Sequence, residues 1–126
     1  MGNYFNGYAI KDIRGLALDQ WRIPTILELE TLANVGVNKL RAISTWTDNL
    51  GTDNYGFELK LSGKVNQSGI FSLLQSNKEA SFLWTSDKLT ATKINYFILV
   101  TDNTTQTPTP NTSSRNWGMP IRLIKD

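Results

Sequence analysis

Apolar residues recur at helical spacing over the segment that follows Thr25. The recurring positions are Ile26, Leu29, Leu32 and Ala33. They repeat every three or four residues, as the buried face of a helix does. Thr25 is a good N-cap residue and Glu28 lies three positions on, the spacing of a reciprocal capping box. The pattern predicts a helix that begins after Thr25 and stops near Gly36, with a short second turn over residues 40–43.

Strand-like patterns dominate the rest of the chain, where apolar and polar residues alternate or aromatic and β-branched residues cluster. These runs are residues 4–10, 57–61, 81–85, 95–101 and 117–124. Pro120 in the last run favours an edge position or a bulge. Two polar segments rich in turn formers, 45–54 and 102–116, predict exposed loops. One or two helices followed by mainly antiparallel strands predict an α+β fold.

Length and charge narrow the classes of partner. The chain has 126 residues, with 13 basic and 11 acidic side chains and a formal net charge of +2, so we expect a single domain. Because no basic run exceeds two residues, we expect neither a nucleic-acid partner nor binding to an anionic membrane. No apolar stretch is long enough to cross a bilayer, and the first ten residues lack the pattern of a signal peptide.

The sequence contains no cysteine and no histidine. It therefore lacks a thiol nucleophile, an imidazole base, the usual zinc or copper ligands and a disulfide framework. Gly63-Lys64 has Glu58 in place of the glycine that a phosphate-binding loop requires five residues earlier. Asp48, Asp53 and Asp87 are available for a glycosidase-type carboxylate pair. Their Asp/Asn/Gly surroundings favour the simpler interpretation, that they are turn carboxylates.

Four separate blocks of the chain carry a family resemblance. They are WRIPT at 21–25, the Tyr-Gly-Phe block at 55–57, the Trp-Thr-Ser-Asp block at 84–87, and WGMPIRLIKD at 117–126. In this order they resemble the FISUMP family, the Fibrobacter succinogenes major paralogous domain, over residues 16–126. That family is similar to C-type-lectin-like domains and to the formylglycine-generating enzymes. The resemblance implies a small twisted antiparallel sheet with paired terminal strands, a capped helix beside it and a loop-rich upper half.

Within that fold the WRIPT block is expected to be a scaffold device. Ile23 is expected to anchor the chain in the core, Pro24 to stiffen the helix entry, and Trp21 to cover the sheet. The alternative, Trp21 as a platform for a ligand, stays open. Family members carry a pair of cysteines at the positions of Ala17 and Leu123, and the resemblance implies that these two residues lie close together.

Two features of the family's relatives are missing from this sequence, and their absence narrows the functions that we expect. Without cysteine the chain cannot carry the formylglycine-generating activity, and it lacks the calcium-binding motifs of sugar-binding C-type lectins. The resemblance implies an exported, often lipid-anchored, bacterial surface protein with no catalytic role. We therefore expect a non-enzymatic ligand-recognition or adhesion module that binds glycan or protein without calcium, any other metal or a cofactor. The alternatives are a structural module of a surface assembly and, last, an enzyme that acts on polysaccharide.

The resemblance places recognition on the upper loops. Trp46 is the tryptophan that helix or strand patterning explains least, so we expect it to be an exposed aromatic platform. The polar residues expected around it are Asp48, Asn49, Asn54, Asn103, Arg115 and Asn116. The alternative is that Trp46 folds down over the core and these polar side chains only solvate turns. The oligomeric state is not determined by the sequence.

Overall fold

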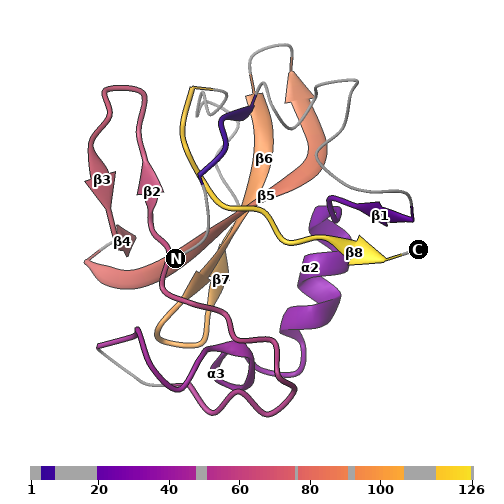
Figure 1. Cartoon of the computed structure of the whole chain (residues 1–126), viewed down its shortest axis with the longest axis vertical. Helices are drawn as coiled ribbons and strands as arrows, with labels where there is room; N and C mark the ends of the chain where they lie inside the picture. Colours follow the sequence, from indigo (N-terminus) through magenta and orange to yellow (C-terminus); the bar gives the residue numbers. More distant parts are fainter. Residues whose placement is uncertain are drawn as a thin grey trace.

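The computed structural model describes residues 4–7, 20–47, 51–75, 77–90, 93–106 and 116–125, with only the backbone described at 88–90 and 93–95. The helices and strands follow one another as β1 (Trp21–Arg22), α2 (Ile26–Ala33), α3 (Val37–Leu40), β2 (Lys64–Val65), β3 (Phe71–Ser72), β4 (Leu74–Gln75), β5 (Lys78–Thr90), β6 (Lys93–Val100), β7 (Thr105–Gln106) and β8 (Ile124–Lys125). The two helices precede the main sheet (Figure 1), so the fold is α+β.

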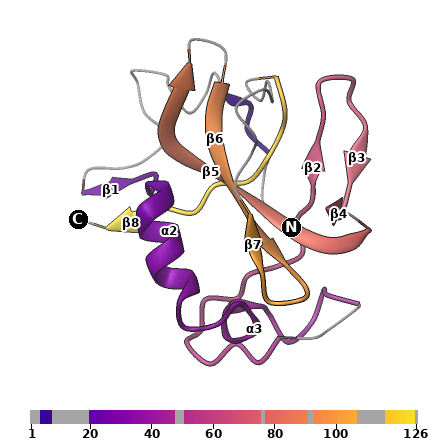
Figure 2. The same ribbon diagram turned by 180° about the vertical axis from the view of Figure 1, so that it is seen from behind.

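The main sheet has the strand order β4-β5-β6-β7, and all its neighbouring strands are antiparallel. The long β5–β6 hairpin forms its centre, with Ala80 opposite Val100 and Trp84 opposite Tyr96. The expected strands at 81–85 and 95–101 are confirmed within β5 and β6, apart from residue 101, which follows the end of β6. Helix α2 lies against this hairpin, and α3 lies beyond the end of α2 (Figure 2).

Both faces of the β5–β6 hairpin are buried, which explains why residues 96–100 of β6 form an unbroken apolar run instead of an alternating one. One face presents Leu83, Phe97 and Leu99 to a core with α2, α3 and the 57–61 segment. The other face belongs to a second core, formed by Ala80, Phe82, Trp84, Tyr96, Ile98, Val100 and Met119. Phe5, Trp117 and Ile121 pack around that second core. The central hairpin therefore carries two hydrophobic layers.

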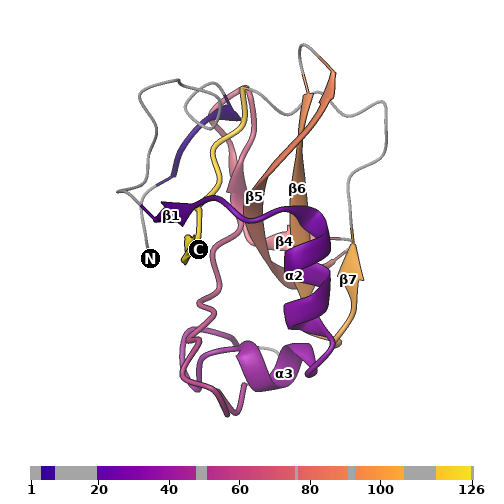
Figure 3. The same ribbon diagram turned by 90° about the vertical axis from the view of Figure 1, so that its right-hand side faces the viewer.

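Helix α2 begins as the sequence predicts. Thr25 adopts an extended N-cap conformation, its hydroxyl accepts the Glu28 N–H at 3.2 Å, and the Glu28 carboxylate accepts the Thr25 N–H at 3.0 Å. Arg22 holds the same carboxylate with two hydrogen bonds of 2.6 and 2.5 Å. Arg22 of the WRIPT block thus supports the capping box from strand β1. Figure 3 shows the path of the chain from β1 into α2.

The helix entrance is also bound to the central hairpin. The Ser86 N–H donates to the Pro24 carbonyl at 2.9 Å, and the Asp87 carboxylate accepts the Ile26 N–H at 3.0 Å. Both β5 residues lie where the β5–β6 register shifts, between Trp84 and Lys88. A bulge of this kind turns backbone groups and side chains away from the ladder. Asp87 is therefore a cap at the start of α2, and the Ser86–Pro24 hydrogen bond joins the WRIPT block to β5.

Two expectations for the WRIPT side chains are wrong. Trp21 does not cover the sheet, because β1 pairs with β8 in a separate two-stranded ladder, and 44% of its surface is exposed. Ile23 is only half-buried, and Pro24 is the buried residue of the block. The terminal strands pair as expected, with Trp21 opposite Lys125.

Several expected elements have different bounds. Helix α2 ends at Ala33, and Gly36, at φ +105°, separates it from α3, which lies earlier than the expected turn at 40–43. The 57–61 run is not a strand, because Glu58 has φ +51° and breaks the extended backbone. Its alternation still places Leu59 and Leu61 in the core.

The chain ends were also expected to be longer strands. In the first run, Phe5 forms an isolated bridge with Met119, and residues 8–10 lie outside the described residues. Gly118 forms a similar bridge with Val65, and Ile124 is the only residue of the expected 117–124 run that lies in a strand, β8. The expected loop 45–54 contains no helix or strand at its described residues, whereas the expected loop 102–116 contains β7.

Candidate functional site

A cavity of about 300 Å³ opens between two segments that are far apart in sequence. Residues 56–60 with Ser62 form one wall, residues 120–122 form the other, and Leu83 of β5 contributes from the sheet. We call this cavity the Arg122 groove. Leu59 and Leu83 are buried members of the first core, so the apolar part of the groove rests on that core.

Arg122 lies across the Phe57 ring in this groove. Its guanidinium carbon is 4.1 Å from the ring centroid, and Nη2 donates to the Phe57 carbonyl at 2.9 Å. Burial lowers the pKa of Arg122, while the carboxylates of Glu58 and Asp53 act in the opposite direction. The side chain is half-buried, and a guanidinium remains charged under all physiological conditions. The groove therefore contains a partly desolvated cation held in a fixed plane.

The chain on both sides of Phe57 contains residues in left-handed backbone conformations. Asp53, Gly56 and Glu58 have φ values of +45°, +68° and +51°. The Asp53 carboxylate stabilises the turn by accepting the Glu58 N–H at 2.8 Å, and the Asn54 N–H donates to the Lys39 carbonyl at 2.9 Å. Positive φ at non-glycine residues is costly and gathers at ligand sites and tight turns. These hydrogen bonds join this wall of the groove to Asp53 and, through Lys39, to α3.

The other charged groups of the groove lie near solvent. Lys60 and Glu58 are exposed and line the cavity. Tyr55, directly before Gly56, exposes 64% of its surface. The groove thus combines an aromatic base, cationic donors and a carboxylate acceptor, which together can hold a ligand that has both an apolar face and polar substituents.

Trp46 is not the exposed platform that the sequence suggested. Only 2% of its surface is accessible, and its indole N–H donates to the Leu59 carbonyl at 2.7 Å. The alternative interpretation, in which Trp46 folds over the core, is the observed one. The segment after α3 turns inward because Ala42 and Leu40 form backbone hydrogen bonds with Leu59.

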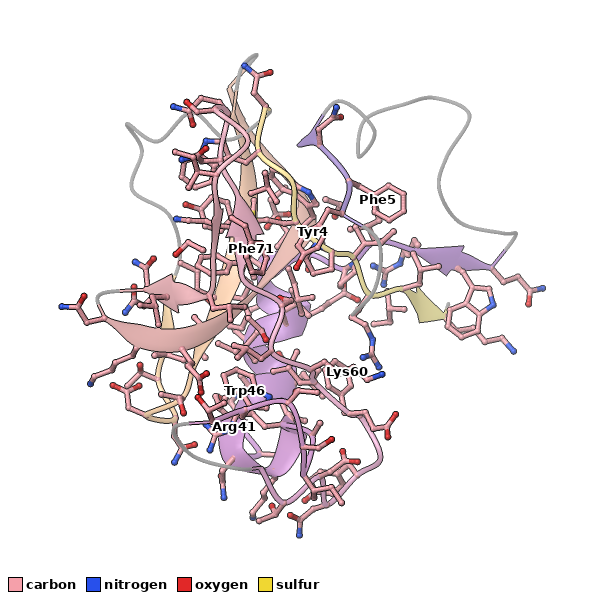
Figure 4. The ribbon with its side chains drawn as sticks, turned by 60° about the vertical axis from the view of Figure 1, so that its left-hand side comes forward. Tyr4, Phe5, Arg41, Trp46, Lys60 and Phe71 are labelled. Carbon is pink, nitrogen blue, oxygen red and sulfur yellow. The ribbon has the colours of Figure 1, made fainter. Side chains whose placement is uncertain are left out.

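Trp46 also packs against a fully buried arginine, Arg41 (Figure 4). The Arg41 guanidinium lies 5.4 Å from the indole centroid, and Nη1 donates to the Thr101 carbonyl at 2.8 Å and to the Asn103 amide oxygen at 3.1 Å. Its Nε and Nη2 have no hydrogen-bond partner within the part of the chain that the structure describes. Burial lowers the pKa of Arg41, opposed by Asp102. Arg41 and Trp46 thus form an interior pair that supports the β6–β7 turn.

The other expected binding residues do not form one patch with Trp46. Asn54 is exposed in the turn beside the Arg122 groove. Asn103, at φ +69°, lines a different depression of about 410 Å³, against α2 and α3. Asn116 is exposed before the closing segment. The remaining three, Asp48, Asn49 and Arg115, lie outside the described residues, as does Ala17 of the expected Ala17–Leu123 pair.

Sequence patterning missed the central residues of the groove. It assigned Phe57 and Arg122 to two strands. In the structure both residues lie on irregular segments, and their side chains are in contact. The available signal was a lone arginine in the apolar run Pro120-Ile121-Arg122-Leu123-Ile124. A cation within such a run needs a partner, and the Phe57 ring and carbonyl supply it.

Metal ligands, membrane-spanning helices and similarity to known proteins were each sought in the chain. Among the described residues, no three acidic side chains gather closely enough to hold a metal ion. None of the described helices is long and apolar enough to cross a membrane. No protein-family model, curated protein or solved structure matches the chain.

Proposed function

We propose that this domain is a non-enzymatic ligand-recognition module of an exported bacterial surface protein, and that the Arg122 groove is its binding site. The observation that carries the proposal is the half-buried Arg122 guanidinium, fixed on Phe57 at the edge of an open cavity. Its charge and remaining donors can serve an incoming ligand, because Nη2 alone makes a protein hydrogen bond in the described structure. Such preorganised cations on a rigid scaffold are typical of recognition sites.

The resemblance to the FISUMP family and to C-type-lectin-like domains belongs to the same proposal. Two of the four resembling blocks, 55–57 and 117–126, contribute Phe57 and Arg122 to the groove. The β1–β8 ladder is consistent with the paired terminal strands of that fold. The proposed surface location rests on this family resemblance, and it would place the irregular segments where a ligand on another cell or polymer can reach them.

Binding is preferred to catalysis on the chemistry of the groove. The sequence offers no cysteine and no histidine, which removes the commonest nucleophiles and proton-transfer groups. A glycosidase requires two carboxylates across the scissile bond. Glu58 is the single carboxylate among the described residues that line the cavity. Asp53 and Asp87 are engaged by backbone N–H groups of Glu58 and Ile26.

A structural assembly module is the second candidate, and a different surface favours it. Ile70, Phe71 and Leu74 are exposed on the β2–β3 hairpin and the strand that follows it. Phe71 makes an edge-to-face contact with Tyr4 at 6.1 Å, and the two rings lie together in Figure 4, away from Trp46. Self-association that the substitution Ile70→Ser abolishes would support this second function.

The proposed function is tested by an array screen followed by mapping. The purified domain is applied to glycan and peptide arrays in the presence of a calcium chelator, and each hit is titrated into ¹⁵N-labelled protein. We expect the amide shift changes to concentrate at residues 55–62 and at Ile121 and Arg122. Hits that shift only other regions would reject the Arg122 groove, and a screen without hits would favour the assembly module.

A further inference from the structure

The charges that line the Arg122 groove are unequal. Arg122 and Lys60 contribute two cations, and Glu58 contributes one carboxylate. No carboxylate of the described residues lies within ion-pair distance of either cation; the two ion pairs that the structure gives are Arg22–Glu28 and Lys78–Asp102. Asp53 and Glu58 influence Arg122 only through longer-range electrostatics. Among the described residues, the groove therefore holds a cationic surplus without a direct counter-ion.

The orientation of Arg122 makes this surplus specific. Its guanidinium is held on one side by the Phe57 ring at 4.1 Å and by the Phe57 carbonyl at 2.9 Å. A planar guanidinium fixed in this way loses little conformational freedom when it binds a carboxylate in a bidentate manner. Because the side chain is half-buried, the interaction is less screened by water than a surface ion pair.

The other features of the groove suit a sugar ring. A volume of about 300 Å³ is at the small end of ligand sites. The Glu58 carboxylate can accept hydroxyl hydrogen bonds, and the exposed Tyr55, which directly precedes the lining residue Gly56, offers an aromatic face. Sugars combine hydroxyl groups with an apolar ring face, which matches this mixture of carboxylate and aromatic groups.

Resting on the proposed function, we infer that the Arg122 groove binds an acidic saccharide, with the sugar carboxylate on Arg122 and Lys60 and the hydroxyl groups toward Glu58. The chemical class is a hexuronate unit, free or within an acidic polysaccharide. A neutral hexose would leave the two cations without a partner. A peptide would present a carboxylate to the two cations without the ring hydroxyl groups that Glu58 can accept from a sugar.

The test compares matched probes by ¹⁵N NMR titration at fixed ionic strength. The probes are glucuronate, galacturonate, glucose, galactose, acetate and an N-acetylated tripeptide. We expect a hexuronate to bind about tenfold more tightly than its neutral hexose, because hydrogen bonds to charged groups are the strong ones. Acetate and the peptide are expected to bind more weakly than the hexuronate, because neither presents sugar hydroxyl groups.

Variants assign the preference to the groove. Arg122→Gln and Lys60→Gln are each expected to reduce the acid-to-neutral ratio several-fold. Lys39→Gln removes an exposed cation outside the groove and is expected to preserve that ratio. If Arg122→Gln unfolds because it loses the Phe57 contacts, the exposed Lys60→Gln variant still tests the assignment.

The outcomes separate this inference from the proposed function. Equal binding of hexuronate and hexose at the groove would overturn the acidic preference and leave a recognition site in place. A peptide that binds as tightly as the hexuronate would overturn the saccharide assignment. Acid preference that persists in both groove variants would place the anion elsewhere. No shift at residues 55–62, Ile121 or Arg122 with any probe would contradict the acidic-saccharide inference. Array hits of another class that map to the groove would leave the recognition function standing.

Discussion

Replacing Trp46 by alanine is expected to destabilise the domain, because the structure places this side chain in the first core. The indole is almost fully buried and its N–H donates to the Leu59 carbonyl at 2.7 Å. The Arg41 guanidinium carbon lies 5.4 Å from the centroid of the indole ring. Truncation of a buried tryptophan typically costs about 3–5 kcal/mol. For a domain of this size that loss corresponds to a decrease in Tm of roughly 10–20 °C.

A second substitution separates the hydrogen bond from the packing. Trp46→Phe removes the indole N–H, but the Leu59 carbonyl still accepts the Ala42 N–H at 3.0 Å. The carbonyl is therefore not left without a partner, and the loss of one such hydrogen bond costs about 0.5–1.5 kcal/mol. Together with the smaller ring, we expect a total of about 1–3 kcal/mol for Trp46→Phe, clearly less than for Trp46→Ala.

Urea denaturation followed by circular dichroism measures both values. Trp21→Ala is the matched control, since Trp21 is 44% exposed on a two-residue strand and should cost about 1 kcal/mol or less. A Trp46→Ala protein as stable as Trp21→Ala would refute the burial argument. Near-normal stability combined with lost ligand binding would restore Trp46 as a site residue.

Three further predictions concern the entrance of helix α2 and metal binding. Hydrogen bonds from Arg22, and then from the Thr25 N–H, lower the pKa of Glu28 to about 2, so its contribution to stability is present above about pH 4.5 and is lost as the pH falls toward 2. The stability difference between wild type and Glu28→Gln should therefore shrink over that window, with Glu30→Gln as the control; a difference independent of pH would contradict the ion pair. Asp87→Ala should cost about 1 kcal/mol in urea melts, as loss of a helix cap does, because it frees the Ile26 N–H, and an unchanged midpoint would contradict the cap. Calcium and a chelator should leave Tm unchanged, whereas a rise of several degrees with calcium would reveal a metal site that stabilises the native state.

Hydrophobic patterning predicted the central hairpin and helix α2 well, and it was least successful in the irregular segments. The 57–61 alternation correctly placed Leu59 and Leu61 inward. The same alternation wrongly predicted a strand. Glu58 has a positive φ, and its N–H donates to the carboxylate of Asp53, a residue outside the run. The prediction that Trp46 is an exposed platform was wrong for a related reason. A loop tryptophan can lie in solvent or fold onto a core, and its neighbours in sequence favour neither position.

The sequence by itself determined those features that depend on neighbouring residues. The Thr25–Glu28 capping box joins groups three residues apart, and the apolar runs of β5 and β6 are strand-forming on their own. Only the tertiary structure brought Phe57 to Arg122, 65 residues away, and Asp87 to the start of α2, 61 residues from Ile26. Contacts at such separations depend on how both sheet faces are covered, which no local pattern encodes. The candidate site consists of contacts of this second kind, and for that reason it became visible only in the folded chain.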